Sequence, residues 1–102
     1  MAKNFRITSH GNKNRLYLKL SGIFDAASAM ELIYALKENS GIAKQVYIET
    51  DGLDSLLPFG RDVFKTRFFL SPEKSKNLVF IGDHGKQIAP RGICCLNRDE
   101  RS

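Results

Sequence analysis

The sequence has few cysteines and no arrangement of residues typical of a metal site. Its two cysteines, Cys94 and Cys95, are adjacent and cannot join distant segments as the disulfides of a secreted scaffold do. We interpret them as free thiols. A vicinal disulfide is one alternative, and a zinc site that includes His10 or His84 is another. We expect no metal and no cofactor.

Long apolar runs are also missing. No window approaches the ~18 apolar residues needed to cross a bilayer, and the start of the chain lacks the apolar core of a signal peptide. We therefore expect a cytoplasmic protein without a membrane span. Its 102 residues, 42% of them apolar, suit one domain, which we place at residues 5–90. Residues 91–102 are interpreted as a tail, part of it disordered.

Catalytic patterns are equally scarce. Neither histidine has a nucleophile near it in sequence, and residues 82–86 lack the Ser or Thr of a phosphate loop. An enzyme that uses His84 with Cys94 or Cys95 is supported by residue type alone. We predict no catalytic residues and a protein that is not an enzyme.

The pattern of apolar residues predicts the order β-β-α-β-α-β. Alternation at residues 5–8 and 15–20 indicates a hairpin, with a turn at residues 10–14 and an end at Ser21-Gly22. Asp25 is a predicted N-cap for a helix that buries Ala29, Leu32, Ile33 and Leu36 and ends at Asn39-Ser40-Gly41. Residues 45–49 and 77–82 are predicted strands. Between them, a second helix presents Val63, Phe64, Phe68 and Leu70 inward and stops at Ser71-Pro72. Helices between the later strands favour parallel pairing, with the hairpin at one edge.

The formal charge of +5 is unevenly distributed. Basic residues gather in residues 1–22 and in residues 61–76, which include Arg61, Lys65 and Arg67. This pattern leaves an anion-binding module on the second helix, for nucleic acid or an anionic membrane surface, as an alternative function. Aromatic residues do not alternate with basic ones along the sequence, so nucleic acid is not the expected partner.

Three stretches together resemble the STAS domain, which sulfate transporters share with bacterial anti-sigma factor antagonists. Residues 22–29 are similar to the strand-to-helix passage of that family, and residues 46–53 are similar to its central strand. Residues 77–82 resemble the strand that follows. The resemblance covers residues 5–85 and implies an α/β fold, a mixed sheet flanked by helices. A helix that closes the domain after Gly82 is not visible in the sequence.

The departure from the family lies at Leu56-Leu57-Pro58-Phe59-Gly60. The family has an apolar residue, Asp, Ser, Ser or Thr, and Gly at the matching positions, and a partner kinase phosphorylates the first serine. That position is Pro58 here, which has no hydroxyl and cannot be phosphorylated. Proline does fit the first turn of a helix.

The resemblance implies a bacterial, regulatory protein-interaction domain without the phosphoserine switch. The predicted partner-binding residues are Asp25, Leu57, Pro58, Phe59, Gly60, Arg61 and Lys65. The predicted partner is a protein, either an anti-sigma or kinase-like regulator or a transporter subunit, and a homodimer is an alternative. Whether the apolar residues at this corner are exposed for docking or packed inside stays open at this point.

Overall fold

A mixed sheet forms the centre of the protein. The computed structural model describes residues 4–39, 43–68, 77–89 and 94–96. Within these residues the strands are β1 (Arg6–Gly11), β2 (Arg15–Phe24), β3 (Gln45–Glu49), β4 (Leu53–Leu56), β5 (Leu78–Ile81) and β6 (Cys94–Leu96). The sheet order is β1-β2-β3-β5-β6, and β4 pairs with the end of β2. β1 is antiparallel to β2, whereas every other pairing is parallel. The predicted edge hairpin and parallel pairing are confirmed.

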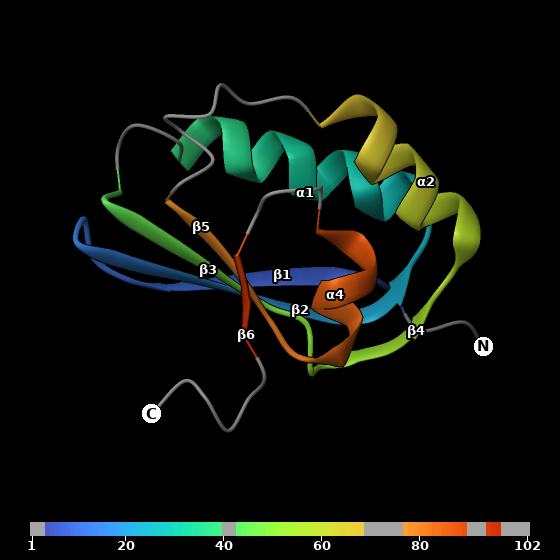
Figure 1. Cartoon of the computed structure of the whole chain (residues 1–102), viewed down its shortest axis with the longest axis horizontal. Coiled ribbons are helices and arrows are strands. Elements are labelled where there is room, and N and C mark those ends of the chain that lie inside the picture. The colour runs from blue at the N-terminus through green and yellow to red at the C-terminus, as the bar shows by residue number, and fades with distance from the viewer. Residues whose placement is uncertain (1–3, 40–42, 69–76, 90–93, 97–102) are drawn as a thin grey trace.

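Helices pack on one face of this sheet and enclose the core. In the described part of the chain they are α1 (Ala26–Asn39), α2 (Pro58–Arg67) and α4 (Asp83–Ile88). Figure 1 shows α1 and α2 lying above the sheet. The four predicted apolar positions of α1 are buried, and Phe64 of α2 and Ile88 of α4 belong to the same core. Phe68 is buried as predicted, while Leu70 and Ser71-Pro72 lie outside the described residues.

The two faces of the first strands differ because side chains alternate along a strand. In β2, Leu18 and Leu20 are buried under the helices, whereas Tyr17 is half-buried and Lys19 is exposed. All four residues of β5 are buried, as predicted for a strand covered on both faces. The sheet therefore has one face under helices and, across β1 to β3, a second face open to solvent.

Two predicted strand ends are wrong. β2 does not stop at Ser21-Gly22 but continues to Phe24, because Gly22 takes a φ of 88° and the register with β4 shifts there. Such a bulge redirects a strand without ending it. β1 runs on to Gly11, so the turn is shorter than predicted. The Asn12 side chain closes this turn by accepting hydrogen bonds from the N–H groups of Asn14 and Arg15.

The structure adds three short elements to the predicted order. β4 follows β3 after a turn of a few residues, and α4 begins directly after β5, where no helix was visible in the sequence. β6 lies within the segment interpreted as a tail and pairs with β5. The longest of the three has six residues, too few to display a helical or strand period. In the described part of the chain, no helix is both long enough and apolar enough to span a membrane.

Candidate functional site

The candidate site is the corner where α1 and α2 begin, at the end of β2. Phe24 pairs with Leu56 of β4, and the N–H of Leu57 then donates to the Phe24 carbonyl oxygen at 3.0 Å. α1 starts one residue after Asp25, and α2 starts at Pro58. Pairing of β2 with β4 therefore holds the starts of the two helices next to each other.

Asp25 has the structural role that its position predicts. Its carboxylate accepts a hydrogen bond from the N–H of Ser28 at 2.9 Å, which makes Asp25 the N-cap of α1. The Ser28 hydroxyl lies 2.9 Å from the same carboxylate oxygen and 2.9 Å from the Ile23 carbonyl oxygen. The hydrogen bond from the Ser28 N–H, followed by the one from its hydroxyl, lowers the pKa of Asp25. The cap holds the start of α1 at the edge of the site.

The start of α2 has no such cap. Leu57 occupies the N-cap position in an extended conformation, and no side chain hydrogen-bonds to the helix start there. Pro58 follows in the first turn. Proline lacks a backbone N–H, but an N–H at this position would have no partner within the helix in any case. The first turn also contains no acidic residue. The helix start therefore presents apolar side chains. Pro58 has no hydroxyl, so it cannot be phosphorylated.

Gly60 fixes the distance between α2 and the end of β2. A β-carbon at this position would lie 2.5 Å from the Phe24 carbonyl oxygen and 2.8 Å from that of Asp25. Both neighbours are backbone atoms, so neither can rotate away. Gly60 is buried, and its lack of a β-carbon lets α2 approach the end of β2.

The apolar residues of the corner are exposed. Phe59 retains 79% of its surface in contact with solvent and Leu57 retains 41%. Pro58 is exposed as well. The corner is therefore an apolar surface held on a closely packed support, which answers the question that the sequence left open.

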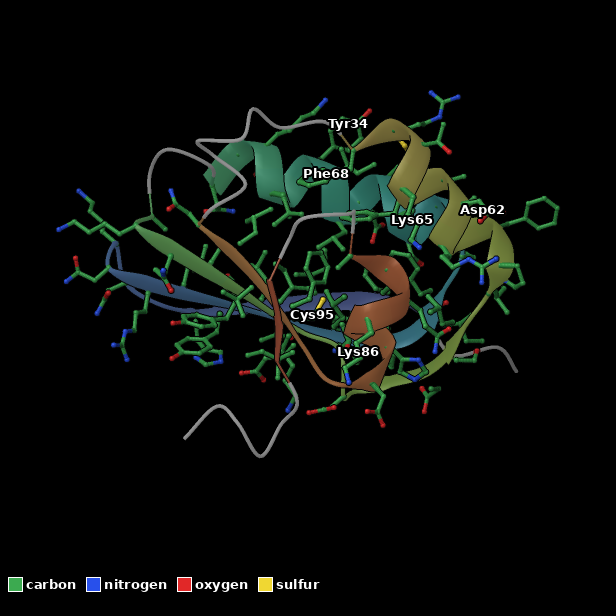
Figure 2. All side chains as sticks on the ribbon, in the orientation of Figure 1. Tyr34, Asp62, Lys65, Phe68, Lys86 and Cys95 are labelled. Atoms are coloured by element: carbon green, nitrogen blue, oxygen red, sulfur yellow. The ribbon has the colours of Figure 1, made fainter. Side chains whose placement is uncertain are left out.

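Charged side chains of α2 continue from this surface. The Arg61 guanidinium lies 3.3 Å from the Asp62 carboxylate, and this pair is partly exposed. Lys65 and Arg67 are exposed in the last turn of the helix. Figure 2 shows Asp62 and Lys65 on α2, with Lys86 on α4 below them.

Sequence reasoning missed one exposed aromatic residue on α1. Tyr34 retains 58% of its surface in contact with solvent, more than Leu57 does. The signal was present in the helical pattern, because Tyr34 falls outside the apolar stripe formed by Ala29, Leu32, Ile33 and Leu36. A large aromatic residue on the polar face of a helix is a feature to note when a docking surface is sought.

The remaining candidate residues are His84 and Cys95. Cys95 is half-buried, and its Sγ lies 3.9 Å from the Gly85 carbonyl oxygen. Nδ1 of His84 is buried and has no hydrogen-bond partner among the described residues. Within residues 4–39, 43–68, 77–89 and 94–96, no three His, Cys, Asp or Glu side chains are placed to hold a metal ion. Most of the predicted site residues lie at the corner where the two helices begin, whereas Lys65 lies in the last turn of α2.

The comparisons with known proteins identify the fold. A solved structure of the anti-sigma factor antagonist SpoIIAA in its unphosphorylated form is similar to this chain, with a TM-score of 0.62. The likeness covers 90% of this chain and 86% of that chain, at 9% sequence identity. Neither a family model nor a curated protein matches the sequence. The protein thus has the α/β STAS fold, a mixed sheet flanked by helices, as predicted.

Proposed function

We propose that this chain is a non-catalytic, regulatory protein-interaction domain that docks a partner without phosphorylation. The observation that carries the proposal is the exposure of Phe59, 79% of whose surface faces solvent at the start of α2. Exposed aromatic residues next to other apolar side chains are typical of protein-protein interfaces. The likeness to an anti-sigma factor antagonist supports a role of this general kind.

The docking surface consists of Leu57, Pro58 and Phe59, with Arg61 and Lys65 at its border. Phe59 serves as the anchor, because an aromatic ring buried at the centre of an interface gives most of the binding energy. Asp25 and Gly60 belong to the support, since one caps α1 and the other seats α2 against the sheet. No step of this interaction needs a hydroxyl at position 58.

The partner is a protein of one of two kinds. It is an anti-sigma or kinase-like regulator, or else a subunit of a membrane transport complex. A second copy of the chain is the remaining alternative. Each occupant would cover the same apolar surface, so the experiment below is designed to identify which one it is.

The test is photo-cross-linking from position 59. A variant with a photoreactive phenylalanine analogue in place of Phe59 is irradiated in the native cells, and its adducts are identified by mass spectrometry. The same analogue at Thr66, exposed on the last turn of α2, is the matched control. We expect a specific protein adduct from position 59 that is absent from position 66. An adduct with the chain itself would indicate a homodimer.

Affinity measurements with the purified partner complete the test. Burial of a phenylalanine ring contributes about 1.5–3 kcal/mol, so Phe59→Ala should weaken binding by roughly ten-fold or more. Phe59→Asp should weaken it further, whereas Thr66→Ala should leave it unchanged. Full binding by Phe59→Asp would show that the partner docks elsewhere. Both Phe59 variants should keep the stability of the wild type because the ring is exposed.

The alternative is an anion-binding module that uses α2. Lys65 and Arg67 support it, since both are exposed. They lie in the last turn, however, while the end of a helix that attracts anions is its start. Arg61 is also next to Asp62. Salt-sensitive binding to anionic vesicles, lost in a Lys65→Ala, Arg67→Ala variant, would favour this alternative over protein docking.

A further inference from the structure

A column of three stacked rings lies across the open face of the sheet. His10, Tyr17 and Tyr47 occupy directly paired positions on β1, β2 and β3. The centroids of His10 and Tyr17 are 5.1 Å apart with planes at 6°, and those of Tyr17 and Tyr47 are 4.9 Å apart with planes at 15°. Tyr47 lies 30 residues after Tyr17 in the sequence, and the strand register brings the three rings together. We refer to them as the aromatic column.

The column ends at an exposed ring. β1 is the edge strand of the sheet in the described residues, and none of their strands covers the side of His10 that faces away from Tyr17. His10 is exposed, whereas Tyr17 and Tyr47 are half-buried within the row. The outer face of the imidazole is therefore a flat surface on which one more planar ring could stack.

Basic side chains surround this end of the sheet. Lys13 and Arg15 are exposed in the β1–β2 hairpin. Lys44 is exposed just before β3, and its N–H donates to the Lys13 carbonyl oxygen at 2.8 Å. This hydrogen bond holds the two lysine-bearing segments together beside the column. We refer to Lys13, Arg15 and Lys44 as the basic cluster.

The open face has an excess of positive charge. Along β1 to β3 it carries Arg6, Arg15 and Lys19 against Glu49, which is paired in register with Lys19. Asp54 of β4 is a second exposed acidic residue and lines a pocket with Arg6, so the excess is largest at the hairpin end, beside Lys13 and Lys44. A second copy of the chain would bring this excess against itself and be repelled. The complementary partner is an anion, and the exposed ring of His10 favours an anion that also has planar rings.

We propose that this face binds single-stranded nucleic acid, with one base stacked on His10 and the adjoining phosphates on the basic cluster. Such strands combine flat bases with regularly spaced anionic groups, and proteins bind them through aromatic platforms beside basic residues. A duplex hides its base faces and cannot extend the column. An acidic polypeptide would satisfy the basic cluster but leave the His10 ring uncovered. The site lies on a different surface from the Phe59 corner and is independent of the proposed docking function.

The test measures binding of labelled oligouridine and oligothymidine by fluorescence anisotropy at low salt. Stacking of a base on an aromatic side chain contributes about 1–3 kcal/mol, so His10→Ala should weaken binding roughly 5- to 150-fold. The triple variant Lys13→Ala, Arg15→Ala, Lys44→Ala loses three proposed phosphate contacts. The slope of log K against log salt concentration should therefore become less steep by about 2. His10 and the basic cluster are exposed, so these variants should fold normally, which circular dichroism would verify.

Two controls separate the column from the rest of the molecule. Tyr34→Ala removes an exposed aromatic ring from α1, and Lys65→Ala with Arg67→Ala removes the exposed cations of α2. Neither change should affect binding. The chain has two histidines, so NMR signals of the His10 ring can be assigned with His10→Ala, and a stacked base should shift them.

Four results would overturn the proposal. They are no binding of either oligonucleotide, unchanged affinity in His10→Ala, equally tight binding of a duplex, and loss of binding in the α2 variant. Competition by polyglutamate as strong as by oligouridine would instead assign the face to an acidic protein partner. Each of these outcomes leaves the docking proposal for Phe59 untouched, because that proposal is tested by cross-linking at another surface.

Discussion

Replacing Gly60 by alanine tests the packing on which the candidate site is built. The new β-carbon would lie 2.5 Å from the Phe24 carbonyl oxygen, 2.8 Å from that of Asp25 and 2.9 Å from the Asp25 carbonyl carbon. All three neighbours are backbone atoms at the end of β2 and the start of α1. To accept the methyl group, α2 must move away from the sheet or these backbone segments must shift.

The expected cost follows from two opposing effects. Alanine stabilises a helix relative to glycine by up to about 1 kcal/mol. Forcing an extra carbon into a packed site costs about 1–3 kcal/mol, and the rigid backbone neighbours place Gly60 in the upper part of that range. We therefore expect Gly60→Ala to lower the free energy of unfolding by about 1–2 kcal/mol. For a domain of this size, the corresponding fall in Tm is roughly 5–15 °C.

Gly85 provides a matched control because it also occupies the third position of its helix, α4. Its added β-carbon would meet the Phe80 β-carbon at 3.0 Å and the Phe80 carbonyl carbon at 3.4 Å, a looser contact than at Gly60. Gly85→Ala should stay within about 1 kcal/mol of the wild type. Thermal unfolding followed by circular dichroism measures both variants. An unchanged or raised Tm for Gly60→Ala would refute the close seating of α2 against β2.

Three further substitutions, at Asp25 and Thr50, test individual hydrogen bonds. Asp25→Ala should cost about 1 kcal/mol through loss of the N-cap, and Asp25→Asn should retain most of that stability. Because hydrogen bonds lower the pKa of Asp25 from its ordinary value of 3.8, the stabilisation is complete above that value and is lost as pH falls through the folded-state pKa. Urea unfolding should therefore depend less on pH in Asp25→Asn than in the wild type over this acidic range. Thr50→Val removes a buried hydroxyl that donates to the Ile81 carbonyl oxygen at 2.6 Å, and should cost about 1 kcal/mol in urea unfolding.

The long elements could be predicted from the sequence because each displays a full period. The 14 residues of α1 are enough to display an apolar stripe along one side of the helix. Asp25 marks the start of the helix. The four apolar residues of β5 indicated a covered strand. By contrast, β4, α4 and β6 have between three and six residues, and tertiary pairing rather than local pattern creates them. Gly22 was interpreted as a strand end because a bulge and a turn both use glycine.

The candidate site could be located from the sequence, but its exposure could not. Resemblance and spacing placed the corner at residues 57–60, yet an apolar run is equally compatible with a packed helix start. The exposure of Leu57 and Phe59 depends on the rotation of α2 about its own axis. Gly60, packed against β2, and Phe64, buried in the core, fix that rotation. The aromatic column could not be predicted from the sequence for a similar reason. His10, Tyr17 and Tyr47 become neighbours only through the strand register, which no local pattern specifies.

Under the proposed docking function, the chemistry at the start of α2 favours an apolar partner group over an anionic one. The start of a helix normally attracts anions through its free N–H groups and its dipole. Pro58 removes one of those N–H groups, and Leu57 supplies no side-chain oxygen to order the rest. Phe59, in the same first turn, adds an exposed apolar ring. A phosphate would find fewer donors here, whereas an apolar side chain of a partner would find a surface that is always available. We therefore expect binding at Phe59 to depend on apolar contact and to vary little with salt.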